Sequence, residues 1–152
     1  APSTEDVNFA ALSTSSDRAT LYVGDGQGPS VYKYAIGSVH LSLLSITQPM
    51  MTGGGVRRIV VSPSGTTLFW DDNALDATAL PASRYMTATP VLDVSPDSRV
   101  AITQTSVIDV ATGAVLGALP YTGPFAIAPD SQTLFISSGG VIHTVDLSAF
   151  HM

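Results

Sequence analysis

The sequence predicts an all-β fold, and three observations support this prediction. Eleven of the twelve acidic residues are Asp, and Lys33 is the only lysine. Glu and Lys keep their side-chain freedom on a helix, whereas Asp bonds to its own backbone and favours turns. The 13 Gly and 10 Pro supply many turn positions between short apolar runs. No stretch keeps helical periodicity over about ten residues or more.

Length and charge narrow the class of protein further. The 152 residues suffice for a single core, so we expect one domain over residues 1–152. A net charge of −6 makes nucleic acid an unexpected partner. No apolar run reaches the roughly 18 residues of a membrane helix, so we expect no membrane span. The 18 Ser, 16 Thr and absence of Cys favour an extracytoplasmic or secreted location.

An internal repeat determines the expected architecture. The turns Pro63-Ser64-Gly65, Pro96-Asp97-Ser98 and Pro129-Asp130-Ser131 place their prolines 33 residues apart, twice. Helical repeats share such a period. Each turn is instead followed by a short apolar or β-branched run, such as residues 67–70, which favours strands. The repeat therefore predicts units of short antiparallel strands.

Large apolar side chains on the second strand of each unit recur at the same spacing as the turn prolines. Phe69, Ile102 and Phe135 each lie six residues after the turn proline. We expect all three to face inward at equivalent positions and to pack between neighbouring sheets. Trp70 should point to the other face of its sheet, because side chains alternate along a strand. A neighbouring sheet would still cover it.

Four units follow one another, at about residues 7–47, 57–87, 91–119 and 124–147. In the first unit Ser15-Ser16-Asp17-Arg18 replaces the proline turn, and the adjacent Leu43 and Leu44 indicate a bulge. The second unit has a weak outer half, and the fourth lacks an outer strand. Sheets arranged radially bury faces that no unit buries alone. We therefore predict a β-propeller of about four short four-stranded blades, complete or partial.

The third and fourth units resemble a known repeat. Residues 107–116 (VIDVATGAVL) and 123–136 (GPFAIAPDSQTLFI) resemble the YVTN-type β-propeller repeat, within the wider lactonase-like and WD-repeat-like group. Such propellers have about seven or eight blades. The resemblance thus implies that the ring is completed by another copy of the chain or by a second propeller segment.

The resemblance also implies a binding face. Loops from second to third strands, and from the last strand to the next unit, emerge together around the central channel; we call this side the loop face. Its adjacent methionines would offer adaptable apolar surface. The candidate ligand-binding residues on it are Asp25, Gln27, Met50, Met51, Arg57, Asp71, Asp72, Asn73, Thr89 and Tyr121.

Three functions remain open. The leading one is a non-enzymatic binding or scaffold module that engages a protein or a glycan through the loop face. The alternative is a metal-assisted hydrolase of the lactonase-like kind, with Asp71, Asp72 and Asn73 among the ligands. These oxygens suit Ca²⁺, but three are fewer than the roughly six to eight it takes. The third is a purely architectural part of a larger propeller.

The remaining motifs indicate scaffold rather than chemistry. Asp97, Asp109 and Asp130 are interpreted as caps of turns. The glycine-rich residues 24–28 lead into a strand, whereas a phosphate-binding loop needs a helix there. No nucleophile or zinc motif occurs, and His143 is expected to be structural. We therefore predict no catalytic residue and no cofactor outside the Ca²⁺ alternative.

Overall fold

The computed structural model describes residues 9–25, 30–47 and 58–150, which form antiparallel sheets. The first sheet contains β1 (Phe9–Thr14), β2 (Thr20–Asp25), β3 (Val31–Ile36) and β4 (Leu41–Ile46). The second contains β5 (Ile59–Val61), β6 (Thr67–Trp70), β7 (Asn73–Asp76) and β8 (Ser83–Met86). Each strand pairs with the next one along the chain.

The third and fourth sheets follow the same plan. The third contains β9 (Val91–Val94), β10 (Val100–Thr103), β11 (Ser106–Asp109) and β12 (Val115–Ala118). The fourth contains only β13 (Phe125–Ile127), β14 (Thr133–Ser138) and β15 (Val141–Asp146), followed by the 3₁₀ helix η1 (Leu147–Phe150). Among the residues that the structure describes, no outer strand pairs with β15, in agreement with the prediction. In the described part of the chain no helix is long and apolar enough to cross a membrane.

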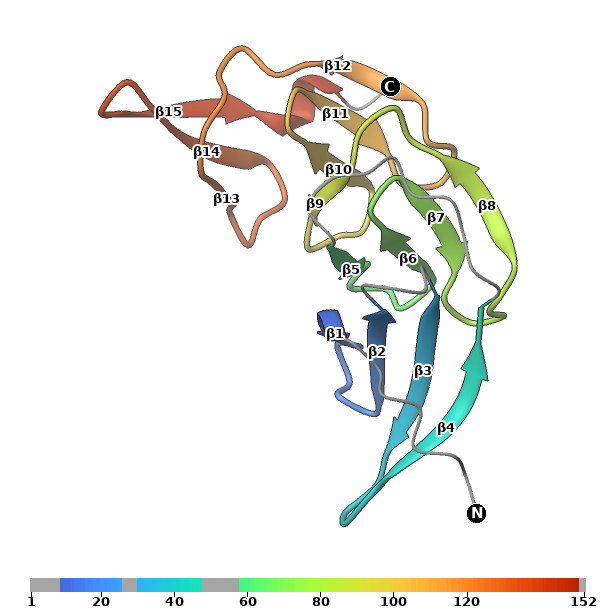
Figure 1. Cartoon of the computed structure of the whole chain (residues 1–152). Coiled ribbons are helices and arrows are strands. Elements are labelled where there is room, and N and C mark those ends of the chain that lie inside the picture. The colour runs from blue at the N-terminus through green and yellow to red at the C-terminus, as the bar shows by residue number, and fades with distance from the viewer. Residues whose placement is uncertain (1–8, 26–29, 48–57, 151–152) are drawn as a thin grey trace.

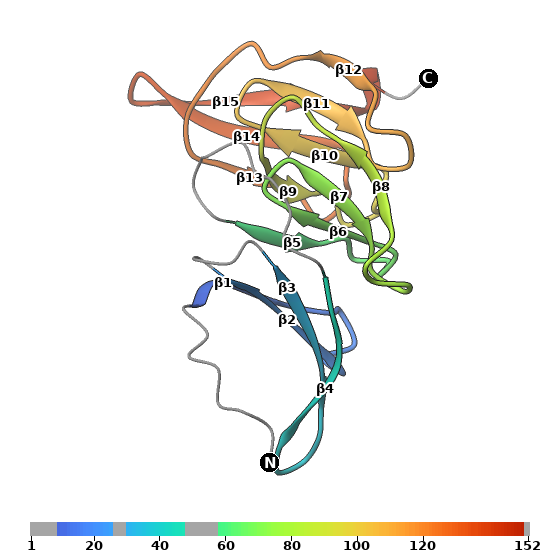
Figure 2. The ribbon, with the colours of Figure 1, turned by 45° about the vertical axis from the view of Figure 1, so that its right-hand side comes forward.

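The sheets stand next to one another in an arc (Figures 1 and 2). The first strands β1, β5, β9 and β13 lie on its concave side, and β4, β8 and β12 lie on its convex side (Figure 1). This is the radial arrangement of propeller blades, so the all-β, partial-propeller prediction is confirmed. The weak outer half of the second unit forms the short strands β7 and β8, and their pairing is irregular between Ala74 and Leu75. The bulge is also present, because Lys33 pairs with Ser45 and Tyr34 with Leu43.

Apolar clusters fill the space between neighbouring sheets. Trp70 belongs to the cluster between the first and second sheets, and Phe69 to the one between the second and third. Both side chains are fully buried on opposite faces of one sheet, as predicted. The Trp70 ring packs directly on Gly24, where an added Cβ would lie 2.0 Å from it. Glycine at position 24 is therefore required by the close approach of two sheets.

The expected burial of Phe135 is wrong. Phe69 and Ile102 are 0% exposed, whereas Phe135 is 41% exposed. Its neighbours Leu134 and Ile136 pack against the third sheet, so strand alternation turns Phe135 the other way. The three side chains do occupy equivalent positions, each directed at the following sheet. Among the described residues no sheet follows β13–β15, which leaves Phe135 uncovered.

Aspartates cap the turns, as the sequence predicts. The Asp97 carboxylate accepts the Arg99 N–H at 3.1 Å and the Ser95 hydroxyl at 2.6 Å. The Asp130 carboxylate accepts the Gln132 N–H at 2.9 Å. Asp109 likewise accepts the N–H of Thr112 at 2.8 Å. These bonds satisfy backbone donors that the tight turns would otherwise leave without a partner.

Serine hydroxyls in the same turns connect neighbouring sheets, which sequence reasoning did not anticipate. The Ser64 N–H donates to Ser98 Oγ at 2.8 Å, and the Asp97 N–H donates to Ser131 Oγ at 2.9 Å. Ser98 and Ser131 have φ of 62° and 61°. Glycine would adopt this conformation more easily but has no hydroxyl. Between the first two sheets the Ser16 hydroxyl donates instead to the Pro63 carbonyl at 2.8 Å.

Alanine substitutions at two equivalent positions should have unequal effects. Phe69→Ala removes a fully buried ring and is expected to lower the free energy of unfolding by about 3–5 kcal/mol. Phe135→Ala removes a half-exposed ring and should cost less than about 1 kcal/mol when the chain is dilute. Urea unfolding at low protein concentration measures both. Equal losses would contradict the assignment of Phe135 to an uncovered face.

Acid should destabilise the protein partly through Asp76. The Thr78 hydroxyl and N–H, with a smaller contribution from Arg84, lower the pKa of Asp76 to about 2. A lowered pKa stabilises the folded state above the unfolded value of about 3.9 and loses this effect as pH falls towards 2. Urea unfolding between these pH values should show declining stability. Asp76→Asn should lose less over the same window, and an undiminished loss would contradict the assignment.

Candidate binding site on the loop face

The predicted site residues do not form one cluster around a single cavity. Gln27, Met50, Met51 and Arg57 lie outside the described residues. Asp25 ends β2, Asp71 and Asp72 make the β6–β7 turn, Asn73 begins β7, and Thr89 lies between β8 and β9. Tyr121 lies between β12 and β13 and lines a pocket that the other described candidates do not reach.

Asp71 forms hydrogen bonds to the backbone of its own sheet and of the third sheet. Its side chain is 1% exposed, and its φ of 53° lies in the left-handed region that Asp tolerates. Its Oδ1 accepts the Arg58 N–H at 2.7 Å, and its N–H donates to the Arg58 carbonyl at 2.9 Å. The Asp71 carbonyl accepts the Val91 N–H at 3.0 Å. Asp71 therefore ties the β6–β7 turn to the start of β5 and to the third sheet.

Asp72 and Asn73 support the same turn. Both are buried, and the Asn73 amide donates to Asp72 Oδ1 at 3.0 Å. The Thr87 N–H donates to the Asp72 carbonyl at 2.7 Å, which joins the turn to the end of β8. Within residues 9–25, 30–47 and 58–150, no three His, Asp or Glu side chains gather closely enough to hold a metal ion. The observed contacts of this trio are those of a structural turn.

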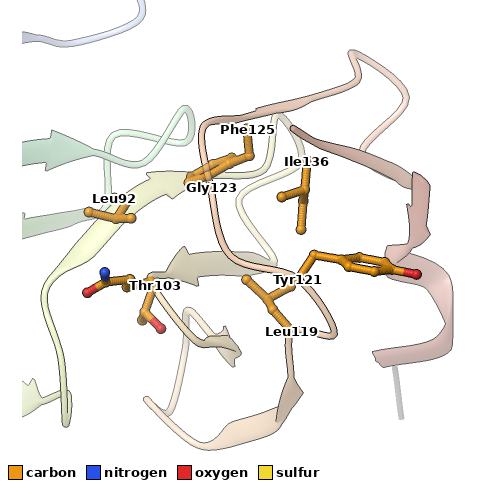
Figure 3. A pocket seen from close by; sticks show the side chains of 8 residues that line it. Leu92, Thr103, Leu119, Tyr121, Gly123, Phe125 and Ile136 are labelled. Atoms are coloured by element: carbon orange, nitrogen blue, oxygen red, sulfur yellow. The ribbon is translucent and has the colours of Figure 1, made fainter. Parts of the chain in front are cut away.

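An open pocket of about 290 Å³ lies between the third and fourth sheets (Figure 3). Leu92 and Thr103 lie on one side of it, and Leu119 and Ile136 lie on the other, with the Tyr121 phenol extending away from them. Ligand pockets in proteins have volumes from about 300 Å³ upwards, so this pocket is a small one. The lining residues are uncharged: Leu92, Thr103, Gln104, Leu119, Tyr121, Gly123, Phe125 and Ile136.

The connection that carries Tyr121 is held tightly against β14. Gly123 has a φ of 152°, and a Cβ added there would lie 2.0 Å from the Ser137 carbonyl oxygen. The Ser137 N–H donates to the Pro124 carbonyl at 2.8 Å. The φ and the close approach require glycine at 123, and the hydrogen bond fixes the path of the chain from β12 to β13. Tyr121 is thereby placed at the mouth of the pocket.

Two further contacts shape the rim. The Tyr121 and His143 rings stack in parallel, with centroids 3.8 Å apart and an interplanar angle of 14°. Thr103 Oγ1 accepts the Ser106 N–H at 3.0 Å, which closes the β10–β11 loop and leaves Gln104 exposed. The structural interpretation of His143 agrees with this stacking. The rim of the pocket therefore consists of the Tyr121–His143 ring pair and the exposed amide side chain of Gln104.

Sequence reasoning identified Tyr121 but not the rest of the pocket. Leu92, Leu119 and Ile136 look like ordinary strand residues in the sequence, because the cavity between them arises only when two sheets meet. Gly123 was the one available signal, since glycine next to proline in a connection indicates a constrained path. The pocket can bind an apolar group, and none of its lining residues carries a charged side chain.

Comparison with known proteins supports the fold. No family profile and no curated protein match the sequence. The hydrazine synthase of Kuenenia stuttgartiensis superposes with a TM-score of 0.70 at 17% identity, over 95% of this chain and 47% of that one. The Cps50 (Swd1) β-propeller domain of Myceliophteria thermophila superposes with 0.68 at 12% identity, over 95% and 54%. A putative 6-phosphogluconolactonase from Bacteroides uniformis superposes with 0.61 at 16% identity, over 91% and 50%.

These likenesses define the class of protein as a β-propeller. The chain spans about half the length of the structures that it resembles. At such low identities the likeness concerns the fold alone. The finer resemblance to the YVTN-type repeat has no matching family profile, so the coarser propeller class is what the comparison supports.

Asp71 should prove structural in a direct test. Asp71→Ala removes the acceptor of the Arg58 N–H and places alanine at positive φ, and we expect a loss of about 1–3 kcal/mol in unfolding free energy. Asp71→Asn keeps an oxygen acceptor and a residue that tolerates this φ, so it should lose less. Urea unfolding of both variants checks the order. The reverse order would contradict the backbone-holding role.

Proposed function

We propose that this chain is a non-enzymatic binding module whose loop-face pocket receives an apolar side chain of a protein partner. The observation that supports it is an open, uncharged cavity of about 290 Å³ with the 37% exposed Tyr121 at its mouth. Partly exposed aromatic residues beside apolar pockets are typical anchors of protein interfaces. A cavity of this size suits one leucine- or phenylalanine-sized side chain.

A protein segment fits the pocket better than a glycan does. Leu92, Leu119, Phe125 and Ile136 give an apolar lining, whereas a sugar would need several polar partners. Gln104 stands exposed at the rim, where its amide can both donate to and accept from the backbone of an extended peptide. The Tyr121–His143 pair forms a flat wall beside it. The proposed ligand is therefore an extended segment with one large apolar anchor.

The same module would act as a scaffold, because the pocket offers an open, uncharged surface to a partner. The catalytic alternative drew on Asp71, Asp72 and Asn73, whose contacts support the backbone of their turn. The hydroxyl-rich, weakly charged composition supports placement outside the cytoplasm. Cell fractionation with an antibody against the chain would check this location.

Selection from a random peptide library displayed on phage tests the binding proposal. We expect enrichment of peptides with a Leu, Phe or Trp anchor that bind the purified chain. Tyr121→Ala should weaken their binding by about 1–2 kcal/mol, because hot-spot aromatics contribute on that scale. Gln104→Ala should weaken binding less, since it removes a rim hydrogen bond. Isothermal titration with the selected peptides gives the affinities.

Arg99→Ala is a matched control on the opposite face. Arg99 lines a different cavity, bordered by Asp109 and Thr112, and its removal should leave peptide affinity unchanged. A library that yields no anchored peptides would refute the proposal. So would peptides whose affinity responds to Arg99→Ala and not to Tyr121→Ala.

A further inference from the structure

The first sheet carries an apolar face that no other sheet covers in the described part of the chain. Strand pairing places Leu12, Val23, Tyr32 and Ile46 in one cross-strand row on this face. A second row on the same face contains Leu21, Tyr34 and Leu43. By strand alternation this face lies opposite to Tyr22, which packs against the second sheet.

Much of this face is accessible. Val23 is buried, and Leu21, Tyr32 and Tyr34 are partly buried. Towards β4, however, Leu41 is 50% exposed, Leu43 51% and Ile46 42%. Contiguous apolar side chains on a sheet face are normally covered by another surface. We call this surface the open face of the first sheet.

The fourth sheet presents the complementary surface. Phe135 is 41% exposed there, at the position whose equivalents Phe69 and Ile102 are covered by the following sheet. Ile142, paired with Ser137 across β14 and β15, lies on the same side and is 71% exposed. At each junction within the chain, one sheet packs on the next sheet along the chain. The first of the two contributes the face that carries Phe135 in the fourth sheet, and the second contributes the face that is open in the first sheet. The exposed parts of these two surfaces thus correspond to the two halves of one junction.

We propose that a second copy of this chain completes both surfaces, with the fourth sheet of each copy packed on the first sheet of the other. Four sheets from each of two chains would form a closed ring of eight. The arc supports this closure, since the chain aligns with about half the length of the propeller structures it resembles. An arc of half a ring is closed by a twofold rotation, which uses the same contact twice.

Charge complementarity supports the same pairing. The turns of successive sheets are linked from Ser64 N–H to Ser98 Oγ, and from Asp97 N–H to Ser131 Oγ. In the turn of the fourth sheet, Asp130 occupies the position of the donors Ser64 and Asp97. In the turn of the first sheet, the residue equivalent to Ser98 and Ser131 is Arg18, which has a φ of 59°.

The junction between copies would therefore place the cationic Arg18 side chain beside Asp130. Arg18 forms no ion pair with any residue that the structure describes. Arg18 stands where the third and fourth sheets have Ser98 and Ser131, so its side chain would reach across to the carboxylate of the other copy and add an opposite charge. This makes the proposed contact specific for the pairing of a fourth sheet with a first sheet.

Disulfide trapping tests the pairing directly, because the chain contains no cysteine. Two single variants, Arg18→Cys and Asp130→Cys, are purified separately, mixed and oxidised. We expect a covalent dimer in the mixture and little in either variant alone. The double variant Asp97→Cys/Ser131→Cys is the positive control, since these positions already meet within one chain. It should form an internal disulfide and therefore run at the mass of one chain, 15.7 kDa, on a denaturing, non-reducing gel.

Light scattering at micromolar concentration supplies the second measurement. The parent chain is expected at twice 15.7 kDa. Phe135→Asp should raise the dimer dissociation constant at least about tenfold, because it places a charge in an apolar contact. Val115→Asp is the matched control on β12, where Val115 is 62% exposed and remains outside the proposed junction. Circular dichroism confirms that both variants fold.

Three results would overturn the proposal. A folded parent chain that stays at the mass of one chain at micromolar concentration would show that the surfaces do not pair. Efficient cross-linking of Arg18→Cys alone would indicate that two first sheets face one another. Equal weakening by Phe135→Asp and Val115→Asp would show that association does not use the face of the fourth sheet. None of these results bears on the pocket between the third and fourth sheets.

Discussion

Every sheet in this protein depends on its neighbour to cover an apolar face. Each consists of short strands with apolar side chains on both sides, so no sheet can bury both faces alone. The junction between Trp70 and Gly24 shows how close this contact is, since even a methyl group at 24 would collide with the indole. The order of sheets, the burial of the second strands and the cavity of the loop face all follow from this contact.

The repeat predicted the architecture well because its signals are local. Turn prolines at fixed spacing, the aspartate caps and strand alternation depend on a few neighbouring residues, and β6 has the expected bounds. Phe135 could not be placed correctly in this way. Its position in the repeat matches that of Phe69, and its exposure depends on whether another sheet follows.

The candidate site was harder to predict, for the same reason. Asp71 stands in a polar turn, where a carboxylate next to two oxygen-bearing residues suggests a ligand set. Its actual contact is with Arg58, 13 residues earlier in the chain. The pocket also forms from the facing surfaces of two sheets, and Leu119 and Ile136 have no sequence signal for such a role. The positions of Tyr121 and Gly123 in one connection were the signals that pointed towards it.

The serine hydroxyls of the proline turns make the junctions between sheets chemically unequal. Where Ser98 or Ser131 occupies the left-handed position, the adjacent sheet is held by a hydrogen bond from its backbone. Gly65 takes that position in the second sheet and has no hydroxyl, so the first sheet is linked by Ser16 instead. In repeat proteins, stability is a sum of units and nearest-neighbour couplings. A single Ser-to-Gly exchange in such a turn therefore changes how cooperatively two blades unfold without changing either blade.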